Sequence, residues 1–150
     1  MPLSRLLTAA TFALAATAAT FTPAARADNL IMVEQDGCAY CARWNAEIAP
    51  IYPKTPEGAF APLRRIDLRG ERPDDLSFET ALVVTPTFVL VDDDGAERAR
   101  IEGYGGDELF WAMLTVVLRD HSDFDVSTAA ATISHEARDE PHDEAEEATN

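Results

Sequence analysis

Two cysteines are the residues of this chain with the most distinctive chemistry. Cys38 and Cys41 are the only cysteines among the 150 residues, and two residues separate them. They follow an apolar run at 30–33 and begin a segment with helical spacing at 39–48. This order places the first sulfur at a helix N-terminus, where unpaired N–H groups and the helix dipole favour an anion. We therefore expect the pKa of Cys38 to be lowered and its thiolate to be reactive.

The spacing of the two cysteines suits thiol–disulfide exchange. Exchange requires an attacking thiolate and a second thiol near enough to resolve the mixed disulfide. Cys38, exposed at the helix tip, is suited to attack. Cys41 lies on the inner face of the predicted helix with Trp44, which we assign to the core. We therefore predict a redox-active disulfide between catalytic Cys38 and Cys41, and no cofactor, because the pair itself carries the electrons.

Two other roles for the cysteine pair stay open. A structural disulfide is compatible with an oxidising compartment, but a four-residue ring would contribute only about 2 kcal/mol, against roughly 3 kcal/mol for fifteen residues. A soft-metal carrier, for copper above all, is the other, because thiolates bind such ions. Structural zinc needs four ligands, and the sequence has no second cysteine pair. Three histidines lie near acidic residues toward the C-terminus, where we expect them to be solvated and to form no metal site: His121, His135 and His142.

Residues 1–27 have the pattern of a secretory signal peptide. Arg5 supplies a positive charge, an apolar, alanine-rich stretch follows at 6–19, and Ala25-Arg26-Ala27 fits a small-x-small cleavage site. The stretch is short and interrupted by threonine, whereas a membrane span needs about 20 apolar residues. We therefore expect export to the periplasm, with cleavage that leaves Asp28 as the N-terminus.

Charge divides the rest of the chain into a domain and a tail. The formal net charge of −15 repels phosphate backbones, so we expect no nucleic-acid partner. Residues 120–150 hold ten acidic residues against Arg138 and few large apolar groups. Such a segment buries too little apolar surface to offset its ordering entropy, so we predict a disordered acidic tail at 120–150. One domain, which we expect to be monomeric, remains at 28–119.

The apolar pattern of 28–119 predicts an α/β domain with the order β-α-β-α-β-β-α, a four-stranded mixed sheet flanked by helices. A β-α-β crossover makes the first two strands parallel, and a tight turn at 92–95 makes the last two antiparallel. The last helix has one wide apolar stripe that we assign to the core: Leu109, Phe110, Met113, Leu114 and Val117. We predict strands at 30–33, 62–68, 83–91 and 97–102, helices at 39–48, 76–82 and 107–119, and a loop at 52–61.

This order of elements, with the cysteine pair at the first helix, resembles the thioredoxin fold over 28–119. In that family the strand after the second helix begins with a cis-proline beside the cysteine pair, and Thr85-Pro86-Thr87 occupies that place. The resemblance implies a cis bond before Pro86. Because proline has no N–H, a substrate has room to pair with the backbone of Thr85. We therefore expect Thr85 and Pro86 to bind substrate, together with Tyr40, which covers one side of the sulfurs.

Longer runs resemble the small periplasmic thioredoxins of sulfur-oxidation (Sox) systems, the SoxS type. The similar runs are 34–50, 85–90 and 102–104. This resemblance implies a reductase that keeps the thiol of a Sox carrier protein active in thiosulfate oxidation. Its substrate would be that protein thiol or disulfide, and a membrane thiol transporter would supply the electrons. The alternative enzyme is a general periplasmic thiol reductase, for example one serving cytochrome maturation.

Two features depart from the ordinary thioredoxin pattern. Ala39-Tyr40 lies between the cysteines, where Gly-Pro is usual, and Met32 occupies the place of a buried acid that many thioredoxins carry six residues before the first cysteine. The group that takes the proton from Cys41 is therefore open. Glu34 and Asp36 are nearby, although simple solvation would also explain them.

Overall fold

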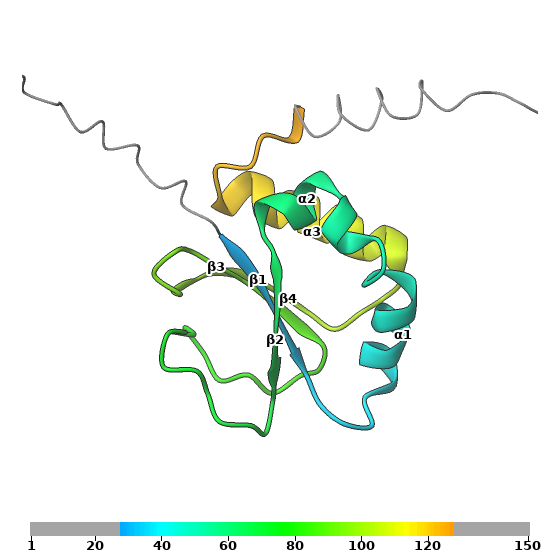
Figure 1. The fold of residues 1–150 in the computed structure, drawn as a ribbon, viewed down its shortest axis with the longest axis vertical. Coiled ribbons are helices and arrows are strands. Elements are labelled where there is room, and N and C mark those ends of the chain that lie inside the picture. The colour runs from blue at the N-terminus through cyan, green and yellow to red at the C-terminus, as the bar shows by residue number, and fades with distance from the viewer. Residues whose placement is uncertain (1–27, 128–150) are drawn as a thin grey trace, which may run out of the picture.

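Four strands and three helices make up the part of the chain that the computed structural model describes, residues 28–127 (Figure 1). The predicted signal peptide at 1–27 and the segment 128–150 of the predicted tail lie outside the described residues. Within the described part, no helix has both the length and the apolar character that a membrane crossing requires. The strands are β1 (Asn29–Glu34), β2 (Leu63–Asp67), β3 (Thr87–Val91) and β4 (Glu97–Glu102), and the helices are α1 (Ala39–Glu47), α2 (Pro56–Phe60) and α3 (Asp107–His121), with a 3₁₀ turn, η1, at Tyr52–Lys54.

The sheet has the strand order β2-β1-β3-β4. β1 pairs in parallel with β2 and antiparallel with β3, and β3 pairs antiparallel with β4. This is the mixed four-stranded sheet of the thioredoxin-like α/β fold that the sequence predicted. Because side chains alternate along a strand, Leu30 and Met32 of β1 face the helices, while Ile31 and Val33 face the opposite side.

The main core lies between the sheet and the helices, and its centre is aromatic. Trp44 of α1 is fully buried, with its ring centroid 5.2 Å from Phe88 of β3 and 5.7 Å from Phe110 of α3. Leu114 and Leu118 continue the buried stripe of α3. The assignment of Trp44 to the core is therefore confirmed, and this residue anchors α1 against the sheet.

The predicted helix at 76–82 is wrong. The leucines of this segment are buried against the back face of the sheet, but its backbone is irregular. The Ser77 N–H donates to the Gly95 carbonyl at 2.9 Å, and the Ser77 carbonyl accepts from the Glu97 N–H at 2.9 Å. These bonds to the start of β4 replace the local bonds of a helix. The sheet is therefore covered by helices on one face and by irregular chain on the other (Figure 1).

The predicted loop at 52–61 instead contains η1 and α2. Thr55 caps α2, because its side-chain oxygen accepts from the Gly58 N–H at 3.1 Å, and Pro56 occupies the first helical turn. Threonine and proline, which suggested a loop in the sequence, thus start a short helix here, at Thr55 and Pro56. The second helix consequently lies between β1 and β2, and none lies between β2 and β3 among the described residues.

The C-terminal boundary of the domain also differs from the prediction. α3 ends at His121 rather than at Arg119. Beyond it, Phe124 packs against Phe60 of α2, with ring centroids 5.2 Å apart. The prediction of a disordered tail is therefore wrong for 120–124, because α3 includes the first two of these residues, Ser122 bonds to Leu118 and Phe124 packs against the core.

The close approach at Gly95 allows a first prediction. Its φ is +76°, and a Cβ there would lie 1.8 Å from the Asp75 carbonyl oxygen. We expect Gly95→Ala to lower the free energy of unfolding by about 3 kcal/mol or more, because backbone displacement adds to a left-handed strain of about 1–2 kcal/mol. Gly103→Ala is the matched control, since Gly103 has φ +84° and no atom within 4 Å of such a Cβ. If urea unfolding showed the same loss of unfolding free energy for both variants, the close approach of Gly95 to the Asp75 carbonyl would be contradicted.

Candidate active site

The cysteine pair lies at the start of α1, where the sequence predicted it. Cys38 is the N-cap and Cys41 lies in the first turn. A disulfide joins them, with an S–S distance of 2.10 Å. Cys38 is half-buried, whereas Cys41 is only 3% exposed. The backbone N–H of Cys41 donates to Cys38 Sγ at 3.1 Å. The first sulfur is therefore the accessible one, and it receives a hydrogen bond from the helix.

A tight turn brings the chain from β1 into α1. Gly37 has φ +77°, a conformation that residues with a Cβ rarely adopt. The Cys38 N–H donates to the Gln35 carbonyl at 3.3 Å and closes the turn. Because α1 then begins directly after its N-cap, Cys38, the Cys41 N–H is one of the helix donors without a backbone partner of its own.

The Thr85–Pro86 peptide bond is cis, as the family resemblance implied. Pro86 is buried, and its carbonyl accepts from the Gly103 N–H at 2.7 Å. β3 begins at Thr87, later than predicted, because Pro86 has no N–H to offer the sheet. This arrangement brings the segment before β3 next to the segment after β4.

A groove of about 510 Å³ adjoins the cysteine pair at Tyr40. Its lining is mostly apolar, and we call it the apolar groove. Tyr40 and Thr85, two of the residues predicted to bind substrate, both line it, and Tyr40 is 60% exposed. The structure therefore brings these two together, whereas Pro86 is not among the residues that line the groove.

α3 contributes three residues to the apolar groove that the sequence assigned to the core, and only one of them, Phe110, is buried. Leu109 and Met113 line the groove and are 52% and 38% exposed. With exposed Val116 they form a second apolar stripe beside the buried one. The assignment of Leu109 and Met113 to the core is therefore wrong. The signal that reveals them is a helix whose apolar residues cover more than one face.

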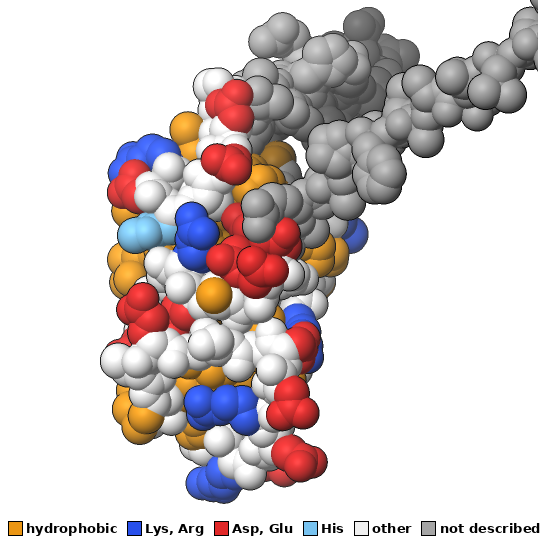
Figure 2. Space-filling view, turned by 90° about the vertical axis from the view of Figure 1, so that its left-hand side faces the viewer, with side chains coloured by type: hydrophobic (Ala, Val, Ile, Leu, Met, Phe, Trp, Pro, Cys, Tyr) orange, Lys and Arg blue, Asp and Glu red, His pale blue; other side chains and the backbone are white. Residues whose placement is uncertain are grey.

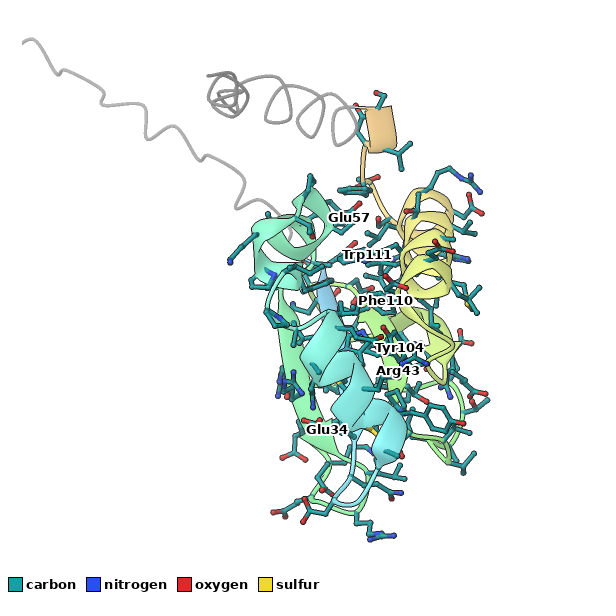
Figure 3. All side chains as sticks on the ribbon, turned by 90° about the vertical axis from the view of Figure 1, so that its right-hand side faces the viewer. Glu34, Arg43, Glu57, Tyr104, Phe110 and Trp111 are labelled. Carbon is teal, nitrogen blue, oxygen red and sulfur yellow. A yellow bond between two sulfur atoms is a disulfide. The ribbon has the colours of Figure 1, made fainter. Side chains whose placement is uncertain are left out.

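Tyr104 joins the wall of the apolar groove to α1 (Figure 3). Its hydroxyl donates to Glu47 at 2.6 Å, while Arg43 pairs with Glu47 at 2.8 Å and lies 5.6 Å from the Tyr104 ring centroid. Burial, and then the bond to Glu47, raises the pKa of Tyr104 above its ordinary range. The same bond, together with Arg43, lowers the pKa of Glu47. At neutral pH the phenol therefore remains a donor to a charged carboxylate.

A second, shallower cleft adjoins the cysteine pair and has a volume of about 410 Å³. We call it the cysteine cleft. Both cysteines line it, and so do four polar residues: Glu34, Gln35, Asp36 and Asn45. Arg65 of β2 bonds to both Glu34 and Asn45 at the edge of this cleft. The cleft therefore holds both carboxylates that the sequence left as candidates for proton transfer.

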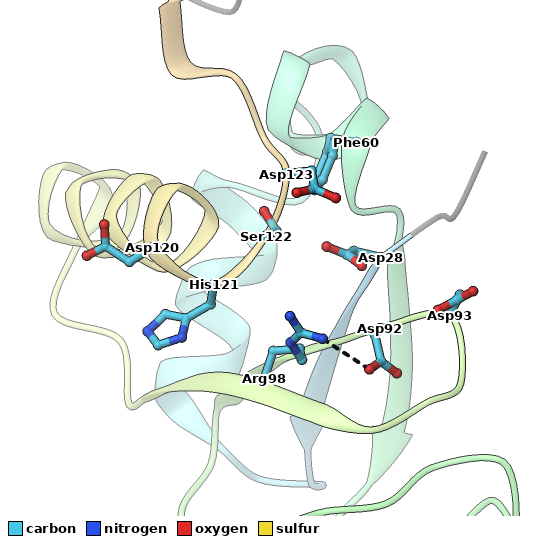
Figure 4. A pocket seen from close by; sticks show the side chains of 9 residues that line it. All are labelled: Asp28, Phe60, Asp92, Asp93, Arg98, Asp120, His121, Ser122 and Asp123. Atoms are coloured by element: carbon cyan, nitrogen blue, oxygen red, sulfur yellow. Dashed lines mark hydrogen bonds and ion pairs between the residues drawn. The ribbon is translucent and has the colours of Figure 1, made fainter.

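A separate acidic pocket of about 480 Å³ lies at the C-terminal end of α3 (Figure 4). His121 and Asp28 line it, and neither cysteine does. Figure 2 shows the histidine near basic and acidic side chains on this face. Burial raises the pKa of Asp28, although Arg98 opposes the shift. His121 is therefore a feature of this pocket and not of the cysteine site.

Among the described residues, no histidine or acidic side chain forms a close three-membered group with the cysteine pair. Within 28–127, the only close group of three or more histidine, cysteine or acidic side chains is Asp92, Asp93 and Asp94. That group contains neither cysteine. In this part of the chain a soft-metal carrier would thus gain no histidine or carboxylate ligand beside the two sulfurs, while His135 and His142 lie outside the described residues.

Comparison with known proteins agrees with this geometry. The family model of the thioredoxin-like domain matches residues 15–118. The crystal structure of the periplasmic thioredoxin SoxS from Paracoccus pantotrophus, in its reduced form, is 48% identical, with an alignment that covers 61% of this chain and 95% of SoxS at a TM-score of 0.59. A thioredoxin-fold protein from Helicobacter pylori is 18% identical over 75% of this chain and 85% of its own, at a TM-score of 0.47. No curated protein matches the chain. With its C-x-x-C disulfide and its relationship to SoxS, this chain belongs to the thioredoxin-like domain family.

Proposed function

We propose that this protein is a periplasmic thiol–disulfide oxidoreductase that reduces a disulfide in a partner protein. The hydrogen bond from the Cys41 N–H to Cys38 Sγ, 3.1 Å long at the start of α1, carries the proposal. In the reduced protein this donor stabilises Cys38 as the thiolate, which is the attacking species in exchange. Cys38 is accessible and attacks, and buried Cys41 resolves.

The two steps transfer two electrons without a cofactor. The Cys38 thiolate attacks one sulfur of the partner's disulfide, and the other partner sulfur leaves as a thiolate. Cys41 then loses its proton and attacks Cys38 Sγ, which closes the Cys38–Cys41 disulfide and releases the second partner sulfur. The cysteine pair is oxidised and the partner is reduced.

The position of the disulfide argues against a purely structural role. It joins residues of one helical turn whose Cα atoms are 5.2 Å apart, so it links no separate elements. A ring of this size contributes only about 2 kcal/mol in the loop-entropy model. A structural disulfide would stabilise the fold more if it joined segments distant in sequence. A redox-active disulfide instead needs an accessible sulfur, and Cys38 provides one.

For the partner, we propose the cysteine-bearing carrier protein of a Sox system. The support is the 48% identity to SoxS, a periplasmic thioredoxin. The periplasmic location is also supported by the signal-peptide pattern of residues 1–27. A membrane thiol transporter would then return electrons to the pair. A general periplasmic thiol reductase would use the same chemistry on a wider set of partners.

The apolar groove is the proposed docking site for the partner segment that carries the disulfide. Tyr40 connects this groove to the cysteines, and Thr85 offers backbone groups to an extended segment. Leu109 and Met113 offer exposed apolar surface further along the groove. We therefore expect the partner segment to be extended and to carry apolar or small residues beside its cysteine.

Cys41→Ser should trap the partner as a mixed disulfide, because Cys38 still attacks but nothing resolves the product. Incubated with a periplasmic extract of a sulfur-oxidising bacterium, the variant should accumulate one dominant adduct, a Sox carrier protein, identified by mass spectrometry. Cys38→Ser is the matched control and should trap nothing. Many unrelated adducts would favour the general reductase, and a pattern equal to the control would sink the exchange mechanism.

Leu109→Asp should weaken docking, because it places a charge in the apolar groove. We expect KM for the protein partner to rise about tenfold, equivalent to ~1.4 kcal/mol, with no change for a small disulfide. Val116→Asp is the matched control, since Val116 is an exposed aliphatic residue of α3 that does not line the groove. Equal effects of the two variants on KM would contradict docking in this groove.

A further inference from the structure

The cysteine cleft holds a carboxylate, that of Glu34, which has no role in the two exchange steps described above. Glu34 lines this cleft together with Cys38 and Cys41. Figure 3 shows Glu34 beside α1. Resolution requires Cys41 to lose a proton, and the lining of the cleft is the nearest place in which to find the acceptor.

Glu34 faces the helix that carries Cys41. It continues the side of β1 on which Leu30 and Met32 pack against the helices, because side chains alternate along a strand. Asn45 lies one helical turn after Cys41, and its Nδ2 donates to Glu34 Oε2 at 3.4 Å. The carboxylate and the buried thiol therefore lie on facing sides of the same interface.

Arg65 of β2 holds the carboxylate in place. Its Nη1 lies 3.0 Å from each carboxylate oxygen of Glu34, and its Nη2 donates to Asn45 Oδ1 at 2.8 Å. Its guanidinium also lies 5.6 Å from the ring centroid of Trp44. Side chains from β1, β2 and α1 thus form a closed network beside the cysteines. The Glu34 side chain remains 27% exposed, so protons can pass between it and solvent.

The environment of Cys41 makes an acceptor necessary. Cys41 is 3% exposed, and burial in apolar surroundings disfavours a thiolate. The titratable groups that line the cleft, apart from the thiols, are Glu34 and Asp36. Asp36 lies in the exposed turn, whereas Glu34 is bonded to α1 through Asn45.

We propose that Glu34 accepts the proton of Cys41 in the resolving step and that Arg65 and Asn45 position it. The inference rests on the proposed function. The Cys41 S–H bond breaks, and the proton passes through the solvent of the cleft to Glu34. The Cys41 sulfur bonds to Cys38 Sγ, the bond from Cys38 to the partner breaks, and the partner leaves as a thiolate. Glu34 then returns the proton to solvent.

Because Arg65 lies beside Glu34, the direction in which the rate of resolution changes when Glu34 loses its charge distinguishes a proton acceptor from a purely electrostatic role. An unpaired carboxylate would repel a thiolate and hold the proton on Cys41, but Arg65 offsets that charge. Removing the charge of Glu34 leaves Arg65, which favours the thiolate. A purely electrostatic role therefore predicts faster resolution after this change, and a proton-acceptor role predicts slower resolution. The groups that face Glu34 are Arg65 and Asp67 of β2, Asp36 of the turn, and the uncharged Asn45 and Cys41 of α1, while β3 has no charged residue.

Glu34→Gln tests the inference, because the amide keeps an oxygen that can accept from Arg65. The reduced full-length protein is mixed with dithiobis(nitrobenzoate), whose coloured thiolate is released once by Cys38 attack and again by Cys41 resolution. We expect Glu34→Gln to slow the second phase at least about tenfold at pH 7 and to leave the first phase unchanged. The difference should shrink only at pH well above the ordinary thiol pKa of about 8.5, because burial disfavours the Cys41 thiolate and only strongly alkaline solution ionises this thiol without an acceptor.

Asp36→Asn is the matched control, since it removes the same charge from the same cleft, and Glu34→Asp should restore part of the rate. Circular dichroism confirms that each variant is folded. A faster second phase, a slowing that is equal at every pH, or equal effects of Glu34→Gln and Asp36→Asn would each overturn the role of Glu34. A wild-type protein that releases only one equivalent of the coloured thiolate would instead overturn the proposed function, because Cys41 would then not resolve the mixed disulfide.

Discussion

The hydrogen bond from the Cys41 N–H to the Cys38 sulfur exists because Cys38 is the N-cap of α1, and several parts of the domain determine where α1 begins. β1 delivers the chain to the end of the sheet, and Gly37 turns it in a left-handed conformation. Further along, Trp44 packs among the core aromatics and fixes the rotation of α1. Loss of such a buried aromatic costs about 3–5 kcal/mol. The packing of the core therefore keeps the Cys41 N–H and the Cys38 sulfur in position, although their hydrogen bond would contribute little stability by itself.

The uneven covering of the sheet decides where the surfaces around the cysteines can form. All helices of the described part pack on one face, and the irregular segment around Ser77 closes the other by pairing with the start of β4. The chain then enters β3 through Pro86, whose carbonyl bonds to Gly103. This bond holds two loops together at one wall of the apolar groove. A helix at 76–82 would have taken up the backbone groups of Ser77 that bond to the start of β4.

The sequence predicted the sheet because its strands and their pairing carry local signals. The turn at 92–95 and the crossover after β1 were enough to assign antiparallel and parallel pairs correctly. Prediction failed where the deciding partner is distant in sequence. The segment 76–82 has helix-like apolar spacing, yet its backbone partners are on β4. The ion pair of Glu34 with Arg65 joins residues 31 positions apart, so only the parallel register of β1 and β2 reveals it.

A carboxylate at position 34 has different properties from one at position 32, although both positions face α1. Met32 is fully buried, and an ionised side chain there would lose hydration at a cost of several kcal/mol. Glu34 stays partly exposed and is paired with Arg65, which offsets the charge of the carboxylate. In the proposed mechanism, the exposed part of the Glu34 side chain gives the accepted proton a route to solvent. The turn of Cys38, Tyr40 and Cys41 borders two surfaces, and the proposed mechanism gives them separate tasks: the apolar groove receives the partner, and the cysteine cleft takes up the proton.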